Sequence, residues 1–352
     1  MYKYIFIISF FLFLPVYKSS AYIQMDNVVE SDGVNTPNDT PPIDTNDLYI
    51  PQSEFYFADN PRTTFTGILP YKETHIRPLN FSIFAGATIT YMTIQHIIQK
   101  NSIWSETGEF RFIEDGNYAL YIDKVGHTYG AYLSSYCFTE MFLWSGFGYD
   151  LSYVLGSSFG VLYTLYVEIM DGFAAGWGFS PSDFYSNVVG STFSLVQHYV
   201  PFLQNFNYKF AYIPANWHGE LPREPHSFFI DDYSSHTFYM SANIHNMLPK
   251  DLKKYWPDWL QLTFGVAVRN LCDLQNPALN CDITRGDVYD GHIVASPRYI
   301  IGLDYDLVKI LPDGSPFWNW VKQTLNYVKL PAPAIEFGPE TRFYLMYPFK
   351  IY

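Results

Sequence analysis

The sequence reads Asp123-Lys124-Val125-Gly126-His127, then Glu168-Ile169-Met170-Asp171-Gly172, then Ser182-Asp183-Phe184-Tyr185-Ser186-Asn187, within the otherwise apolar and aromatic residues 121–190. In the first and third stretches an Asp stands four positions before a His or an Asn, and in the second a Glu stands three positions before an Asp. On helices, each pair projects from one face. Ionisable groups taken out of water are costly unless they are paired or hydrogen-bonded. The three stretches therefore predict one shared, buried polar site where three apolar helices meet.

The candidate site residues are of two kinds. The candidate catalytic residues are the ionisable ones: His127, Asp123, Glu168, Asp171 and Asp183; the candidate binding residues are Lys124 and Asn187. A carboxylate beside a histidine raises the histidine pKa and fixes its tautomer, and such a group can act as a general base. The same residue types can bind a divalent ion, or form a buried network that holds helices in register. These interpretations stay open, and we assign no metal ligand and no cofactor.

Two of the carboxylates have a further interpretation. Asp171 precedes Gly172, which is expected to end its helix, and a carboxylate near a helix C-terminus is electrostatically unfavourable. We therefore expect Asp171 to have a specific partner, and Asp183 could instead cap the helix that follows Ser180. The isolated residues Glu140, His96 and His198 are interpreted as ordinary surface or core residues.

Residues 76–204 are expected to form an apolar four-helix bundle. The expected helices are residues 83–98, 122–144 and 151–170, and a fourth that starts at Ser180-Pro181 and ends near Pro201. A Ser followed by Pro is a typical helix start. Helices that are apolar nearly all round are core or membrane helices. Tyr, Ser and Gly interrupt these runs, so none is a clear transmembrane span, and the polar site is expected inside the bundle.

Residues 205–352 are expected to be rich in strands, which makes the fold class α+β: a four-helix apolar bundle with a buried polar site, followed by an antiparallel β portion. Apolar and polar residues alternate over residues 238–244, 260–268, 301–307 and 343–349. This alternation suits an outer-membrane sheet with its apolar face toward lipid, and equally a half-buried soluble sheet. Five or six strands are too few for a complete membrane barrel, so we expect a soluble or membrane-peripheral sheet. Short amphipathic helices are expected near residues 250–256 and 317–328.

The N-terminal residues indicate export. Residues 1–21 resemble a secretory signal peptide, with Lys3, an apolar run and the cleavage site Ser19-Ser20-Ala21. Residues 22–75 are expected to be a disordered acidic linker, since their composition cannot bury enough surface to fold. We expect a protein of the periplasm or outer membrane of a Gram-negative bacterium. Cys272 and Cys281 are close enough for a disulfide, which stays open, and Cys137 is expected to be a buried free thiol.

Composition excludes some classes of function and favours others. The net charge is −13 and no basic patch stands out, so a nucleic-acid partner is not expected. Aromatic residues make up 20% of the chain, which suits strands and membrane-interface surfaces. No nucleophile-elbow, Walker or dinucleotide glycine pattern occurs. The expected partners are membrane or outer-membrane components, with a lipid or a glycan as the possible ligand.

The three polar stretches carry a family resemblance. In order, Asp-Lys-x-Gly-His from Asp123, Glu-x-x-Asp-Gly from Glu168, and Gly-Phe-Ser-x-x-Asp-x-x-x-Asn-x-x-Gly from Gly178 resemble the YfiM-like family of predicted periplasmic lipoproteins, whose function is unknown. Over about residues 75–352 the chain resembles a longer form found in Bacteroidetes-type bacteria. The His, Glu and Asp-x-x-x-Asn on successive helices also resemble VanZ-like membrane proteins. The chain has no Cys near the signal cleavage site, so lipid anchoring does not carry over, and the resemblance implies no reaction.

Two functions are therefore expected from the sequence. The leading one is a non-enzymatic role in the envelope, either its maintenance or the binding of a lipid or glycan. The alternative is a hydrolase or transferase that acts on a lipid-like or cell-wall substrate through the His/Asp/Glu cluster.

Overall fold

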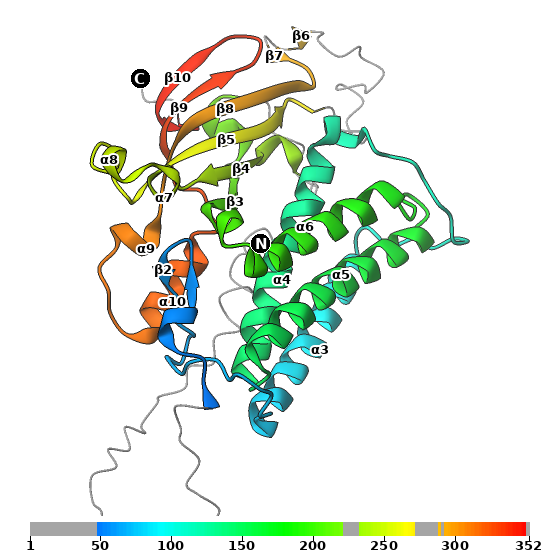
Figure 1. Cartoon of the computed structure of the whole chain (residues 1–352). Coiled ribbons are helices and arrows are strands. Elements are labelled where there is room, and N and C mark those ends of the chain that lie inside the picture. The colour runs from blue at the N-terminus through cyan, green and yellow to red at the C-terminus, as the bar shows by residue number, and fades with distance from the viewer. Residues whose placement is uncertain (1–47, 221–231, 272–287, 290–291, 350–352) are drawn as a thin grey trace, which may run out of the picture.

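The computed structural model describes residues 48–220, 232–271, 288–289 and 292–349. A group of long helices forms one part of the molecule and an antiparallel sheet forms the other (Figure 1). This arrangement confirms the expected α+β class, with the helices preceding the sheet in the chain. The expected signal peptide and the pair Cys272 and Cys281 lie outside the described residues.

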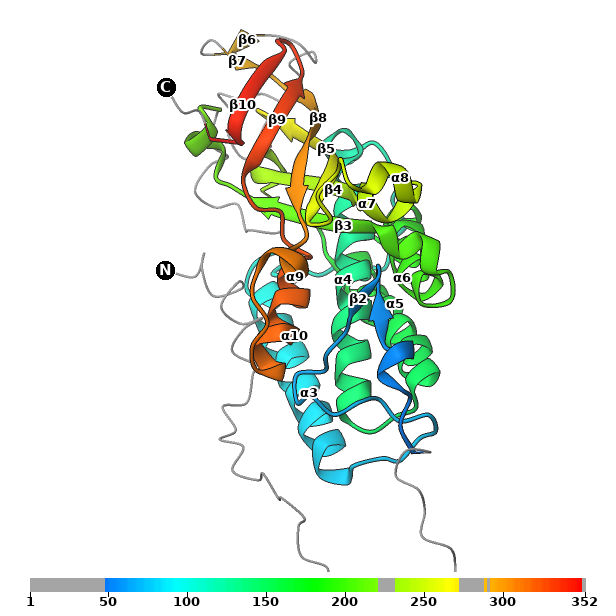
Figure 2. The same ribbon diagram turned by 60° about the vertical axis from the view of Figure 1, so that its left-hand side comes forward.

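Four long helices run side by side: α3 (Pro78–Lys100), α4 (Ile122–Trp144), α5 (Tyr149–Phe173) and α6 (Pro181–Tyr199) (Figures 1 and 2). These bounds match the four expected runs closely. Ser180 caps α6, because its hydroxyl accepts a hydrogen bond from the Asp183 backbone N–H at 3.2 Å, and Pro181 takes the first helical position. Helix α4 is central, since it packs against α5, α6 and the sheet.

Glycines set the close spacing of α4, α5 and α6. A Cβ atom at Gly190 in α6 would lie 2.0 Å from the carbonyl oxygen of Thr128 in α4. A Cβ at Gly156 in α5 would lie 2.0 Å from the Thr139 hydroxyl, also in α4. Small residues of this kind let helix backbones approach closely. The polar side chains that face inward from the three helices are thereby brought within reach of one another.

The sheet has six antiparallel strands in the order β10-β9-β8-β5-β4-β3. Their bounds are β3 (Phe206–Tyr212), β4 (His236–Ala242), β5 (Leu260–Arg269), β8 (Ser296–Tyr305), β9 (Ala332–Phe337) and β10 (Arg342–Tyr347). Phe238 pairs with Val266, and Phe264 pairs with Ile301, so apolar side chains of neighbouring strands share one face. The period-2 alternation of the sequence is the cause of this two-faced sheet.

The apolar face of the sheet is covered only in part. Near β3 and β4 it packs on α4 in a core of buried residues: Ile122, Tyr129, Tyr132, Tyr208, Tyr233, Phe238 and Val268. Farther along, the apolar side chains of Phe264 and Ile301 on the same face are exposed. The polar residues of the opposite face are buried instead, including Lys209, Gln261, Arg298, Asp304 and Glu336. The sheet therefore buries its apolar face only beside α4.

The segment before α3 differs from the expected linker, which extended to residue 75. Residues 48–75 carry η2 (Gln52–Glu54) and the pair β1 (Tyr56–Phe57) and β2 (Asn60–Pro61). The side chain of Phe55 is fully buried, and the guanidinium of Arg62 reaches the interior. Apolar residues such as Ile50 and Phe55 give this segment the buried surface that a purely acidic linker would lack.

Short elements complete the described chain. They are η3 (Tyr118–Tyr121), η4 (Pro201–Asn205), η5 (Ala215–His218), η6 (Tyr233–Ser235), α7 (Ile244–Met247), α8 (Lys250–Lys253), β6 (Val288–Tyr289), β7 (His292–Ile293), α9 (Leu307–Ile310) and α10 (Pro316–Leu325). Helices α8 and α10 lie where the two amphipathic helices were expected. Helix α10 packs against the bundle, where the Tyr136 hydroxyl lies 2.9 Å from the Thr324 hydroxyl.

Candidate functional site

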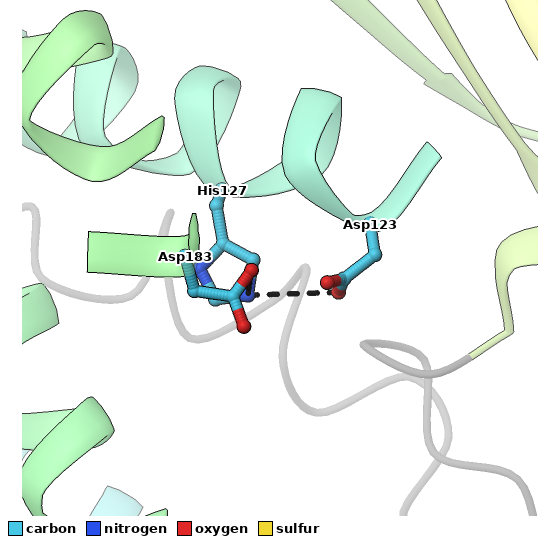
Figure 3. Close-up of side chains that lie close together, drawn as sticks. All are labelled: Asp123, His127 and Asp183. Carbon is cyan, nitrogen blue, oxygen red and sulfur yellow. Dashed lines mark ion pairs between the residues drawn. The ribbon is translucent and has the colours of Figure 1, made fainter. Parts of the chain in front are cut away.

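The polar site forms where one end of α4, α5 and α6 meet. Asp123 and His127 lie in the first two turns of α4, and Asp183 lies in the first turn of α6. Glu168 lies near the C-terminal end of α5, and α5 runs opposite in direction to α4 and α6. Asp123 and Asp183 reach the His127 ring from two different helices (Figure 3).

His127 is the centre of the site. Its Nε2 lies 3.5 Å from Asp123 Oδ1 and 3.6 Å from Asp183 Oδ1. Its Nδ1 lies 3.4 Å from Glu168 Oε1 and 3.3 Å from Asn187 Oδ1. The Asn187 amide also donates to Glu168 Oε1 at 3.4 Å. The structure thus brings together four of the five candidate ionisable residues. The His127 side chain is 25% exposed, whereas those of Asp123, Glu168 and Asp183 are buried.

An internal cation neutralises this cluster. The Lys124 ammonium lies 2.6 Å from Asp123 Oδ2 and 2.7 Å from Asp115 Oδ1, and it also pairs with Asp183. Three carboxylates therefore share one ammonium. Lys124, a candidate binding residue, joins the loop before α4 to both α4 and α6.

Three further candidate residues have different partners in the structure: Asp171, Asn187 and Asp183. Asp171 has the specific partner that its position near the helix end predicted, since the Trp104 indole donates to its Oδ1 at 2.6 Å. Asn187, the other candidate binding residue, is fully buried and bridges His127 and Glu168. Asp183 is not the helix cap; Ser180 takes that role, which leaves the Asp183 carboxylate to face His127 and Lys124.

The charges of the site shift one another's pKa values. Burial alone would lower the pKa of His127, but the surrounding carboxylates, Asp123 foremost, raise it to about 10. Burial raises the pKa of Asp183 to about 6, against the opposing effect of His127 and Lys124. Burial would also raise the pKa of Asp123, but His127 and Lys124 hold it well below its usual range. Burial raises the pKa of Glu168 to about 8, against the opposing effect of His127. At neutral pH the imidazole is therefore a cation between the carboxylates of Asp123 and Asp183, and the Glu168 carboxyl group is protonated.

Among the residues that the structure describes, those best placed to hold a metal ion are Asp123, His127 and Asp183. One possible ligand atom from each lies within 4.8 Å of the others. The Lys124 ammonium, however, already forms ion pairs with Asp123 and Asp183 and neutralises the negative charge that would attract a metal ion. This pairing favours a charged network completed by the protein's own cations.

Two residues of the site could not be found from the sequence. Asp115 pairs with Lys124 and accepts a hydrogen bond from the Ser182 hydroxyl at 3.1 Å. The Tyr233 hydroxyl donates to Asp123 from η6, at the entry to the sheet. No periodicity marks Asp115 among its neighbours, and Tyr233 is one of many tyrosines, so only the three-dimensional structure identifies them.

A second buried ion pair, between Arg62 and Glu140, was also not predicted from the sequence. Glu140 was taken as an ordinary residue, but it is buried and accepts hydrogen bonds from Arg62 and from the Trp320 indole, the latter at 2.9 Å. Arg62 also donates to the Tyr153 hydroxyl. A cavity of about 60 Å³, lined in part by Arg62, Tyr153 and His198, adjoins this pair. The pair joins the N-terminal segment to α4 and α10.

A family model described as predicted periplasmic lipoprotein (DUF2279) matches residues 110–199. The match covers α4, α5 and α6 with all the candidate site residues, and it leaves the sheet uncovered. No curated protein and no solved structure matches the chain. The family description agrees with the expected export to the periplasm or outer membrane, and with an envelope protein of unknown function.

Proposed function

We propose that the protein is an envelope protein that binds the polar end of a lipid or glycan at the His127 site, without converting it chemically. The observation that carries this proposal is a partly open imidazole set in a buried network whose charges are already paired. A histidine that is protonated between carboxylates is a poor base. The resemblance of the three polar stretches to YfiM-like and VanZ-like proteins supports an envelope location and implies no reaction.

The carboxyl oxygens of the site that receive no hydrogen bond indicate the chemistry of the ligand. The described residues send no hydrogen bond to Glu168 Oε2 or Asp183 Oδ2, whose companion oxygens are engaged with Asn187 and Lys124. The Asp183 carboxylate is ionised at neutral pH, so it accepts hydrogen bonds and repels anions, whereas the protonated Glu168 carboxyl group can donate or accept. The ligand is therefore expected to present hydrogen-bond donors, as the ammonium of a lipid headgroup or the hydroxyls of a glycan do.

A hydrolase or transferase acting on a lipid-like or cell-wall substrate is the second candidate. It is favoured by the carboxyl groups on both sides of the His127 ring, Glu168 near Nδ1 and Asp123 near Nε2. A carboxylate on one nitrogen orients an imidazole whose other nitrogen handles a proton. Conversion of the bound molecule distinguishes this candidate from simple binding.

The test measures ligand-induced stabilisation of the full chain in a mild detergent. Soluble short-chain phosphatidylethanolamine supplies an ammonium with N–H donors, the matching phosphatidylcholine supplies none, and chitobiose supplies hydroxyls. A ligand that binds only the folded protein, at a free concentration of one hundred times its Kd, adds about 2.7 kcal/mol to the stability of the protein. We expect the melting temperature to rise with phosphatidylethanolamine or with chitobiose, and not with phosphatidylcholine.

Matched variants connect any effect to the site. Glu168→Gln with Asp183→Asn should abolish the rise, whereas the control Glu73→Gln with Asp258→Asn, which changes two exposed carboxylates in the same way, should keep it. An equal rise with phosphatidylcholine, or a rise that persists in the site variant, would contradict binding at His127. Appearance of a cleaved or transferred product, detected by mass spectrometry, would replace binding by catalysis.

A further inference from the structure

We infer that the outer faces of α3 and α5 lie against the acyl chains of a phospholipid bilayer. This inference goes beyond the proposed function, because binding at His127 does not require any part of the chain to enter a membrane. It rests on which residues of the two helices are buried and which are exposed.

Helix α3 is inverted compared with a helix of a water-soluble protein. Its buried residues are Phe84, Gln95 and Gln99. All of its exposed large side chains except Lys100 at its end are apolar: Leu79, Phe81, Ile83, Ile89, Ile94, Ile97 and Ile98. In water, a helix turns its glutamines outward and its isoleucines inward. This helix has the opposite preference, which is the one that a hydrocarbon environment produces.

Helix α5 shows the same inversion. Its buried side consists of small and polar residues: Ser152, Tyr153, Gly156, Ser157, Gly160, Glu168 and Gly172. Leu151, Val154, Phe159, Leu162, Ile169 and Phe173 are exposed. Close packing through small residues, with ionisable groups turned toward the bundle interior, is the arrangement of membrane helices.

The two helices have the length and charge that a bilayer requires. Both α3 and α5 are long and apolar enough to cross a membrane. The 23 residues of α3 extend for about 34 Å, compared with a hydrocarbon thickness of about 30 Å. The only Lys, Arg, Asp or Glu in α3 is Lys100 at its end, and none occurs between Leu151 and Val167 in α5. The core helix of a soluble protein can share this composition, but it is mostly buried, and these two are not.

Exposed hydroxyl groups in the middle of both helices are hydrogen-bonded to the preceding turn. In α3, Thr90 donates to the Gly86 carbonyl and Thr93 donates to the Ile89 carbonyl, each at 2.8 Å. In α5, Ser158 donates to the Val154 carbonyl at 2.7 Å. An unsatisfied polar group is costly in hydrocarbon, and a bond to the preceding turn removes that cost.

Lipid explains the exposed surface of α3 better than a protein partner does. Leu79 and Phe81 are two positions apart and so point to opposite sides of the helix, and both are exposed. A single docked protein face covers one side of a helix, whereas acyl chains surround all the sides that the bundle leaves open. The His127 site lies within the first two turns of α4, which would place it near the headgroup level of the membrane.

Spin labels in the reconstituted protein test this inference. The full chain, with its three cysteines replaced by serine, is placed in phosphatidylcholine–phosphatidylglycerol vesicles. One label at a time is introduced at Ile89→Cys, Leu162→Cys or, as the aqueous control, Asp258→Cys. Ile89 and Leu162 lie midway along α3 and α5 and are exposed, and Asp258 is an exposed residue before β5. Relaxation enhancement by oxygen reports lipid, and enhancement by a water-soluble nickel chelate reports water.

At Ile89 and Leu162, we expect the relaxation enhancement by oxygen to exceed that by the nickel chelate at least several-fold. At Asp258, we expect the enhancement by the nickel chelate to be the larger one. A response to the chelate at Ile89 and Leu162 equal to that at Asp258 would show that water covers these faces, and it would overturn the inference. Protection from both reagents would show a protein partner instead, and it would overturn the inference equally. A circular dichroism spectrum like that of the unlabelled chain shows that each variant is folded. Labels at Leu79→Cys and Val154→Cys provide a second measurement on each helix.

Discussion

Lys124 is the residue on which the charge balance of the site depends. Its ammonium contacts the carboxylates of Asp115, Asp123 and Asp183, and all of these groups are at least half-buried. Without the ammonium, three carboxylates would face one another in a poorly solvated place, with only His127 to oppose them. Removing one member of a buried charge network typically costs about 3–5 kcal/mol.

Lys124→Met should therefore destabilise the protein by about 3 kcal/mol or more, although it removes no packing volume of consequence. Chemical unfolding of the full chain in detergent measures the change. The matched control is Lys250→Met, at an exposed lysine that begins α8, which should change stability by no more than about 0.5 kcal/mol. Equal unfolding midpoints for Lys124→Met and the original chain would show that the ammonium does not neutralise these carboxylates.

At the residue scale, spacing predicted the site in part. The pairs Asp123/His127 and Asp183/Asn187 could be predicted because four positions place two side chains on one helix face. Asp115 and Tyr233 could not, since each reaches the site from a segment without periodicity. Glu140 was misjudged because its partners Arg62 and Trp320 are distant in sequence.

At the element scale, the bundle depends on the close approach of α4 and α6. A glycine inside a helix usually costs about 0.5–1 kcal/mol relative to alanine. At Gly190, however, an added Cβ would lie 2.0 Å from the Thr128 carbonyl oxygen, which belongs to the backbone and cannot rotate away. At Gly130 in α4, nothing lies within 4 Å of the added Cβ.

The two alanine substitutions should consequently have opposite signs. Gly190→Ala should destabilise the protein by about 1–3 kcal/mol, because α6 must shift away from α4. Gly130→Ala should be neutral or stabilise it by up to about 1 kcal/mol. Thermal melts of the two variants, compared with the original chain, measure both changes, and a stabilising Gly190→Ala would contradict the observed helix spacing.

The buried polar face of the sheet predicts a dependence of stability on pH. Asp304 in β8 pairs with Lys209 at 2.9 Å and with Lys329 at 3.4 Å, and it accepts a hydrogen bond from Ser241 at 2.6 Å. Burial would raise the pKa of Asp304, but Lys209 and Lys329 hold it below its ordinary value. A carboxyl group whose pKa is lowered by folding adds stability above its unfolded pKa, about 3.9, and that stability is lost as the pH falls through the folded pKa.

Asp304→Asn should reduce this acid dependence and also lower stability at neutral pH, because Lys209 then stays buried without its carboxylate. Unfolding free energies measured from pH 7 down to pH 2 follow both effects. Asp258→Asn, at an exposed carboxylate, should leave the acid dependence as it is. An unaltered pH profile in Asp304→Asn would show that the ion pairs of Asp304 do not contribute.

At the whole-molecule scale, the sequence predicted the order of helices and strands better than their environment. Apolar runs and the Ser180-Pro181 start predicted α3 to α6 to within a few residues, and period-2 alternation predicted β4, β5 and β8. Periodicity tells which residues share a face, but it does not tell which face is buried. For that reason the alternation left open whether the apolar face is buried or turned toward lipid, and the structure shows Gln261 and Asp304 buried while Phe264 is exposed. The burial of Phe55 was missed for the same reason, since a short apolar segment carries no periodic signal.

Helices α4, α5 and α6 meet in one charged site, and a double-mutant cycle between two of these helices measures whether their side chains interact. His127 in α4 lies 3.4 Å from Glu168 in α5, although 41 positions separate them in the sequence. Residues in one ion-pair network show coupling energies of about 0.5–3 kcal/mol, whereas distant residues are additive to within about 0.5 kcal/mol. We expect His127→Gln and Glu168→Gln to be coupled by about 1 kcal/mol or more in unfolding experiments, and His127→Gln and the exposed Glu73→Gln to be additive. Additive effects of His127→Gln and Glu168→Gln would contradict the shared site.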